Sequence, residues 1–71
     1  MNRLNHKKLL HSKWTAVHPQ NKEKHFVLTR IVKDNTGVIA SVEMQSILSK
    51  KRRMILRSAL EDDSQWSIGW H

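Results

Sequence analysis

The sequence contains no cysteine, so neither a disulfide nor a thiolate metal site can hold the fold together. A chain of 71 residues forms a single domain, 1–71, and a domain this small buries only about 60% of the surface that its unfolded chain exposes. Without such cross-links, stability depends on efficient packing of large side chains. We therefore predict that Trp14, Phe26 and Trp66 form the structural core.

Long apolar runs are also missing. No run approaches the roughly 20 residues that span a bilayer, and no apolar signal segment follows the first methionine. The stretch Lys7-Lys8-Leu9-Leu10 is too short for an amphipathic membrane helix. Because the lack of cysteine also fits a reducing compartment, we expect a soluble, cytoplasmic protein without a membrane partner.

The residue patterns of most catalytic and cofactor sites are absent. With only Gly37 and Gly69, the chain has no glycine-rich phosphate loop, and its serines lie in no nucleophile elbow. The five histidines are scattered, with no pair at the short spacing of ligands on one element. We predict no enzymatic activity, no cofactor and no metal site.

Acidic residues are few, and the formal net charge is +7. Residues 1–33 carry eight Lys or Arg against one acid, and residues 50–57 carry five Arg or Lys and no acid. The last segment, 58–71, has three acids and no Lys or Arg. Two basic blocks of this kind attract polyanions such as RNA.

Alternating apolar and polar residues predict an all-β or mainly β fold. The turn Asp34-Asn35-Thr36-Gly37 is typical of a hairpin, and Pro19 marks 18–23 as a loop. A second turn is basic, at Lys50-Lys51-Arg52. The four strands of the resulting antiparallel meander are predicted at 12–17, 24–33, 38–48 and 53–59.

The faces of these strands follow from the same alternation. Phe26, Leu28 and Val32 should share one face of 24–33, and Ile31 should lie on the other with Val27 and Thr29. In 38–48 we expect the inward positions to be Val38, Ala40, Val42, Met44, Ser46 and Leu48. So long a strand must bend, which favours a small SH3-like or open barrel. The alternative is a flat meander that dimerises, so both monomer and homodimer stay open.

The two ends of the chain are predicted to be less regular. Residues 1–11 should form a poorly ordered basic arm with one turn at most. Acids before Trp66 and a glycine after it predict a short helix over 62–68, with Trp66 closing one end of the barrel.

Several stretches carry a recognisable pattern of aromatic and charged residues. They are Ser12-Lys13-Trp14-Thr15-Ala16-Val17, Lys22-Glu23-Lys24-His25-Phe26, Leu60 to Asp62, Trp66 and Gly69-Trp70. Together they resemble a family of small bacterial tryptophan-rich proteins classed as a domain of unknown function. The resemblance extends over nearly the whole chain; it implies a single domain and brings no activity with it.

We interpret the protein as a non-catalytic binding module that contacts RNA, or another polyanion, through its phosphates. The predicted contact residues are Lys50, Lys51, Arg52, Arg53 and Arg57, helped by Lys7, Lys8 and Lys13. Cations at a hairpin tip also have a simpler role, since they maintain solubility and keep strand edges from pairing with neighbours.

A protein–protein adaptor is the competing interpretation. It would use Ile68 and Trp70 together with an exposed strand edge, because aromatic residues are favoured anchors at interfaces. Salt separates the two functions: phosphate binding weakens steeply as salt rises, whereas an apolar contact hardly changes.

Overall fold

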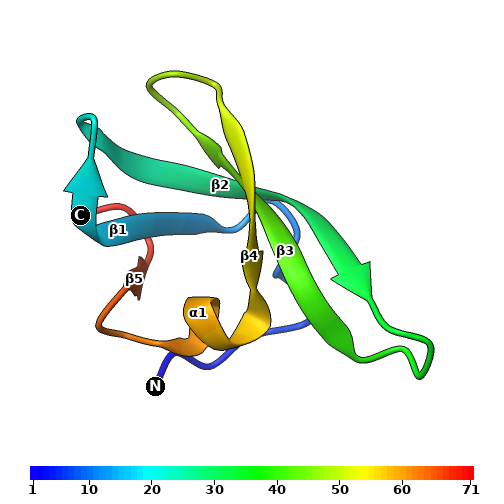
Figure 1. Cartoon of the computed structure of the whole chain (residues 1–71). Coiled ribbons are helices and arrows are strands. Elements are labelled where there is room, and N and C mark those ends of the chain that lie inside the picture. The colour runs from blue at the N-terminus through cyan, green and yellow to red at the C-terminus, as the bar shows by residue number, and fades with distance from the viewer.

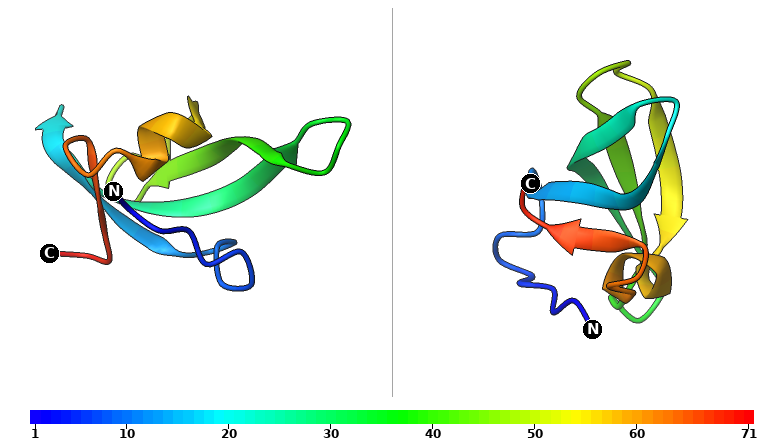
Figure 2. Two further views of the ribbon diagram at one scale, coloured as in Figure 1. Left: turned by 90° about the horizontal axis from the view of Figure 1, so that it is seen from below. Right: turned by 90° about the vertical axis from the view of Figure 1, so that its left-hand side faces the viewer.

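The computed structural model describes all residues 1–71 and consists of one antiparallel sheet with a single turn of helix. The elements along the chain are β1 (Lys13–Gln20), β2 (Glu23–Lys33), β3 (Ile39–Ser46), β4 (Arg52–Leu56), α1 (Arg57–Glu61) and β5 (Trp66–Ile68). In space the strand order is β4-β3-β2-β1-β5 (Figure 1). The sheet is unclosed, and α1 contacts both of its edge strands, β4 and β5 (Figure 2).

The mainly β, antiparallel fold with a short helical turn confirms the predicted fold class. The turn after β2 also has the expected geometry: Gly37 adopts φ 83°, and its N–H donates to the Asp34 carbonyl at 3.1 Å. The number of strands was predicted wrongly, because a fifth strand pairs with β1.

The predicted loop over 18–23 is wrong, since β1 continues to Gln20. Regular pairing between β1 and β2 lapses between Thr15 and Gln20, so Pro19 removes no ladder hydrogen bond there. The hairpin then closes through Asn21 and Lys22, with φ values of 54° and 62°. Positive φ at both central residues is the requirement of a tight type I′ turn.

A bulge in β2 reverses which side chains face the core. Leu28 pairs with Met44, but the next paired residue on β2 is Arg30, opposite Glu43, so Thr29 is the extra residue. The Thr29 hydroxyl donates to the Glu43 carboxylate at 2.9 Å. Beyond the bulge Ile31 packs against the core, which corrects the prediction that it lies on the face opposite Leu28.

A second bulge has the same effect in β3. Val32 pairs with Ser41 and Lys33 with Ile39, which leaves Ala40 as the extra residue. Ile39 is therefore buried, whereas Ala40 and Val38 are exposed, contrary to prediction. Val42, Met44 and Ser46 do face the core. Leu48 does not, because β3 ends at Ser46 and Leu48 lies in the following turn.

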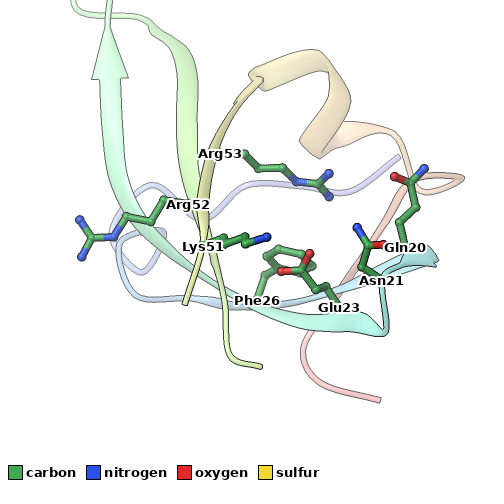
Figure 3. A pocket seen from close by; sticks show the side chains of 7 residues that line it. All are labelled: Gln20, Asn21, Glu23, Phe26, Lys51, Arg52 and Arg53. Atoms are coloured by element: carbon green, nitrogen blue, oxygen red, sulfur yellow. The ribbon is translucent and has the colours of Figure 1, made fainter. Parts of the chain in front are cut away.

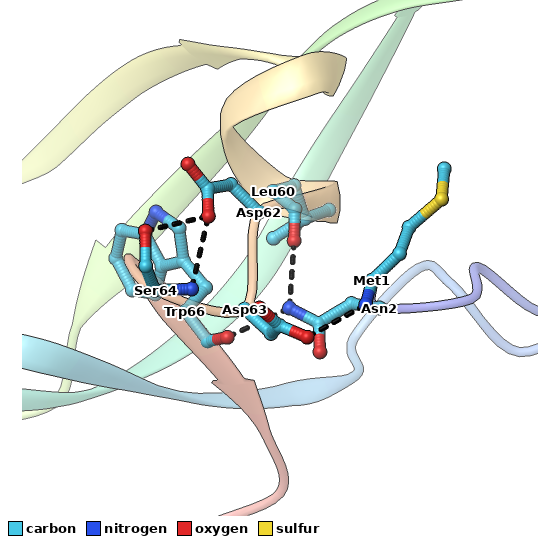
Figure 4. Close-up of polar contacts among 7 residues, drawn as sticks. All are labelled: Met1, Asn2, Leu60, Asp62, Asp63, Ser64 and Trp66. Atoms are coloured by element: carbon cyan, nitrogen blue, oxygen red, sulfur yellow. Dashed lines mark hydrogen bonds and ion pairs between the residues drawn. The ribbon is translucent and has the colours of Figure 1, made fainter.

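The predicted helix over 62–68 is wrong, and so is the end of the predicted strand 53–59. The helical turn comes earlier, at Arg57–Glu61, and Asp62 ends it. The Asp62 carboxylate then accepts hydrogen bonds from the Ser64 N–H at 2.9 Å and hydroxyl at 2.6 Å, forming a local turn (Figure 4). This turn directs Trp66–Ile68 along β1, where Trp66 pairs with Ala16.

The N-terminal segment packs on the fold, against the expectation of a poorly ordered arm. Its Leu9 is buried in the core. The Asn2 amide donates to the carbonyls of Leu60 at 3.0 Å and Trp66 at 2.7 Å, and the Met1 amino group lies 2.6 Å from the Asp63 carboxylate (Figure 4). The segment thereby links α1 to β5.

The core lies between the sheet, α1 and the N-terminal segment. Trp14, Phe26 and Trp66 are all buried, in agreement with the prediction, and the Phe26 and Trp66 rings meet edge to face with centroids 5.0 Å apart. The remaining buried apolar side chains are Leu9, Ala16, Leu28, Ile39, Val42, Met44 and Leu60. Every strand except β4 contributes to this set, as do α1 and the N-terminal segment.

Candidate functional site

Two turns from different hairpins meet at one end of the sheet. The β3–β4 turn (residues 47–51) is joined to the start of β2, directly after the β1–β2 turn, by a hydrogen bond from the Ile47 N–H to the His25 carbonyl at 3.0 Å. The Ser49 hydroxyl also donates to the Glu23 carboxylate. We call this region the cationic end because of the six basic residues that these turns and the adjoining strands carry: Lys22, Lys24, Lys50, Lys51, Arg52 and Arg53.

Most of these positive charges have no acidic partner. Only Arg52 has a carboxylate oxygen within 4.0 Å, that of Glu43, at the limiting distance of 4.0 Å. The other five are exposed or partly exposed to solvent. Their charge is therefore free to act on a ligand.

Glu23 is the one acid between the two turns. Hydrogen bonds from the hydroxyl groups of Ser49 and Ser46 hold its pKa below the ordinary value of 4.5, and the nearby charges of Lys51 and Arg53 lower this pKa further. Glu23 is consequently ionised at neutral pH, and its bond to Ser49 fastens one turn to the other.

A hollow of about 200 Å³ opens beside the two turns (Figure 3). Its wall consists of Gln20, Asn21, Glu23, Phe26, Lys51, Arg52 and Arg53. The side chains of Lys51 and Arg53 extend toward Phe26, whereas that of Arg52 points away (Figure 3).

The alternation of β4 explains why the two arginines diverge. Arg53 is opposite Met44, a core residue, and Arg52 is opposite Gln45 on the other face. The Arg53 guanidinium carbon accordingly lies 5.2 Å from the ring centroid of Phe26 and 5.4 Å from that of Trp66. These distances are those of cation–π contacts.

The structure brings together four of the five basic residues predicted around the second hairpin. Lys50, Lys51, Arg52 and Arg53 belong to the cationic end, but Arg57 does not. Arg57 begins α1 at the far end of β4, where its Nε lies 3.4 Å from the Glu61 carboxylate, one helical turn away.

Sequence reasoning missed Lys22 and Lys24. The signal was nevertheless present in the predicted topology, because the first and third turns of an antiparallel meander lie at the same end of the sheet. The basic residues around the first turn should therefore have been grouped with those of the third.

The second predicted patch, Lys7, Lys8 and Lys13, does not join the cationic end. Lys7 and Lys8 precede β1 in a segment that pairs with the middle of β2, where the His11 N–H donates to the Leu28 carbonyl at 2.7 Å. From Lys13, the full length of β1 leads to the turn at the cationic end. The Lys13 Nζ instead lies 4.7 Å from the centroid of the Trp70 ring.

Ile68 and Trp70, the predicted partner-contact residues, are both partly exposed, with 52% and 41% of their surface accessible. The Trp70 indole N–H donates to the Phe26 carbonyl at 3.0 Å, and the ring centroid lies 5.7 Å from that of His25. Trp70 is thus held in one orientation and still presents part of its ring to solvent.

Two further features concern the side chains that could ligate a metal and the length of the helix. No three His, Cys, Asp or Glu side chains gather in an arrangement that could hold a metal ion. The one helix, α1, has five residues and is too short to cross a lipid bilayer.

The fold and the cationic end define a class of small protein: a curled antiparallel sheet with positive charge gathered at one end, where two turns meet. The chain belongs to the family described as "Tryptophan-rich protein (DUF2389)", whose model matches residues 12–71. This match confirms the family resemblance seen in the sequence, and it includes all five strands and all three tryptophans. Neither the curated proteins nor the solved structures contain a significant match.

Proposed function

We propose that the protein is a non-catalytic binding module whose cationic end contacts the phosphate backbone of single-stranded RNA. The observation that carries this proposal is the meeting of two turns that place six basic residues around one acid, Glu23. Five of the six have no carboxylate within 4.0 Å. Binding phosphates therefore requires no existing ion pair to break.

The mode of binding follows from the side chains. Lysine carries a compact charge on a flexible stem, so Lys22, Lys24, Lys50 and Lys51 can each reach a phosphate. Such contacts are independent of base sequence and release condensed counterions from the nucleic acid. The logarithm of the binding constant should consequently fall linearly with the logarithm of the salt concentration.

Two variants with equal net charge test whether the cationic end is the contact surface. In the first, Lys22, Lys24, Lys50 and Lys51 are changed to Gln; in the matched control, Lys7, Lys8, Arg30 and Lys33 are changed to Gln. Each substitution set removes four positive charges from exposed or partly exposed positions, and the control positions lie away from the two turns. Fluorescence anisotropy with a labelled single-stranded RNA is then measured over a range of salt concentrations.

We expect the cationic-end variant to lose about 3 units from the slope of log K against log salt, since each lost phosphate contact on a single strand contributes about 0.7. The control should keep most of the wild-type slope and affinity. Equal losses in both variants would show that only net charge matters. Absence of RNA binding by the wild-type protein at low salt would refute the proposal.

The partial exposure of Trp70 and Ile68 favours a second candidate function, a protein–protein adaptor. Ile68 is the last residue of the short edge strand β5, and Trp70 follows this strand. Both lie outside the cationic end. A partner held there should stay bound as salt rises, and Trp70→Ala should weaken that complex. The same substitution should leave RNA binding by the cationic end unchanged.

A further inference from the structure

Arg53 differs from the other basic residues at the cationic end because its guanidinium lies against aromatic rings of the core. Its guanidinium lies over the rings of Phe26 and Trp66, which are themselves buried and in edge-to-face contact. The lysines of the turns have no comparable support. The charge of Arg53 is therefore supported by two buried aromatic side chains.

The hydrogen-bond donors of Arg53 are free. The guanidinium makes no ion pair within 4.0 Å and no hydrogen bond to another group of the protein. A guanidinium has five N–H donors in a planar fork that matches two oxygens of a phosphate group. The cation–π contacts with the two rings use none of these N–H donors in a hydrogen bond, so the donors stay available.

The surroundings of the fork favour an anion. Lys51 extends toward the same hollow, and the amide side chains of Gln20 and Asn21 line it (Figure 3). Glu23 also lines the hollow, but its carboxylate accepts the Ser49 hydroxyl. The two positive charges of Lys51 and Arg53 outnumber the one negative charge of Glu23, so the hollow has a net positive charge.

The size of the hollow limits what it can hold. Sites for small-molecule ligands usually measure about 300–1,000 Å³. At about 200 Å³ the hollow is smaller than these sites and is partly open to solvent. A single group that belongs to a longer chain fits this space better than a free cofactor.

We infer that Arg53 is the bidentate phosphate-binding residue of the cationic end, and that the hollow seats one phosphate group of the bound RNA strand with Lys51 as the second cation. This inference rests on the proposed function and divides the surface into two parts. Arg53 and Lys51 hold one phosphate in a defined place, while Lys22, Lys24 and Lys50 attract the remainder of the backbone without fixed geometry.

The substitution Arg53→Lys separates geometry from charge, because it keeps the positive charge and removes the fork. We expect RNA affinity to fall by about tenfold, the size of a lost charge-assisted hydrogen bond, with the salt slope unchanged. The comparison variant Lys50→Gln should lower the slope by about 0.7 and reduce affinity less at low salt. Wild-type affinity in Arg53→Lys, with RNA binding lost in the four-lysine variant, would overturn the inference and leave the proposed function standing.

A measurement on the wild-type protein guards against misfolding of the variant. The Arg53 Nε–Hε and Trp66 indole signals are followed by NMR as RNA or inorganic phosphate is added. We expect both signals to shift with RNA, and the Arg53 signal to shift with phosphate at higher concentration. Binding of RNA with an unmoved Arg53 signal would overturn the inference, and failure of RNA to bind would overturn both proposals.

Discussion

Leu28 and Leu48 show how differently the same residue type is used in this chain. Leu28 lies in the middle of β2 and is completely inaccessible to solvent, whereas Leu48, in the β3–β4 turn, is 66% exposed. Burial of a leucine side chain contributes to stability through both transfer from water and close packing. Position within the sheet, and not hydrophobicity, decides which leucine supports the fold.

We predict that Leu28→Ala lowers the free energy of unfolding by about 2–5 kcal/mol, because it removes buried methyl groups and leaves a cavity. The matched change Leu48→Ala should stay within about 0.5 kcal/mol of wild type. Urea unfolding followed by tryptophan fluorescence measures both. Similar losses in the two variants would mean that Leu28 does not pack as described.

Asp34 governs a pH-dependent part of the stability. The Thr36 hydroxyl and N–H and the Val38 N–H all donate to its carboxylate oxygen, and these bonds hold its pKa below the ordinary value of 3.8. Since the folded pKa lies below the unfolded one, the stabilisation is complete above the unfolded pKa and is lost as pH falls through the folded pKa.

We therefore expect the unfolding midpoint to fall as pH drops below about 4, the range in which an unfolded aspartate takes up a proton. In Asp34→Asn the decrease should be shallower than in wild type. Hydrogen bonds lower the pKa of Asp62 and Glu23 in the same direction, so some acid sensitivity remains in the variant. Identical pH profiles for both proteins would contradict this role of Asp34.

Among the elements, α1 and β5 depend on the N-terminal segment to hold them together. The Asn2 side-chain amide donates hydrogen bonds to the Leu60 carbonyl in α1 and to the Trp66 carbonyl in β5. It thereby connects the two elements. Neither element is long enough to be stable by itself, since α1 has five residues and β5 has three. Their position must come from such tertiary contacts.

The substitution Asn2→Ala is predicted to destabilise the protein by about 1–3 kcal/mol, because it leaves two carbonyls without their side-chain donor. Asn5→Ala is the control: the Asn5 side chain accepts only one exposed bond, from the Lys7 N–H at 3.2 Å, and its loss should cost less than about 0.5 kcal/mol. Thermal unfolding by circular dichroism compares them, and equal midpoints would exclude the bridging role.

At the scale of the whole molecule, one core unites every part of the chain. Leu9 comes from the N-terminal segment, Trp14 from β1, Leu60 from α1 and Trp66 from β5. We predict a single cooperative unfolding transition with an enthalpy of about 50 kcal/mol near its midpoint, as expected for 71 residues. Tryptophan fluorescence and far-ultraviolet circular dichroism should give the same midpoint, and a separate transition for the tryptophans would indicate that β5 or the ends unfold independently.

Some of this architecture could be predicted from local patterns. The Asp34–Gly37 turn, the alternation in β2 up to Leu28 and the burial of Trp14, Phe26 and Trp66 all depend on nearby residues or on residue size. The bulges at Thr29 and Ala40 could not be predicted, because neither position carries a glycine or proline that would mark it. Each bulge shifts the alternation by one residue, so the face assignments hold on only one side of it: before Thr29 in β2 and after Ala40 in β3.

The sequence by itself determined the mainly β class, the antiparallel meander and the basic character of the β3–β4 turn, since these follow from period, turn chemistry and charge. Only the tertiary structure decided that Trp66–Ile68 is a strand beside β1 and that Arg53 rests on Phe26 and Trp66. The physical reason is the range of the interactions: a three-residue strand and a contact between Arg53 and the rings of Phe26 and Trp66 exist only once distant segments have paired, and no local preference records that pairing.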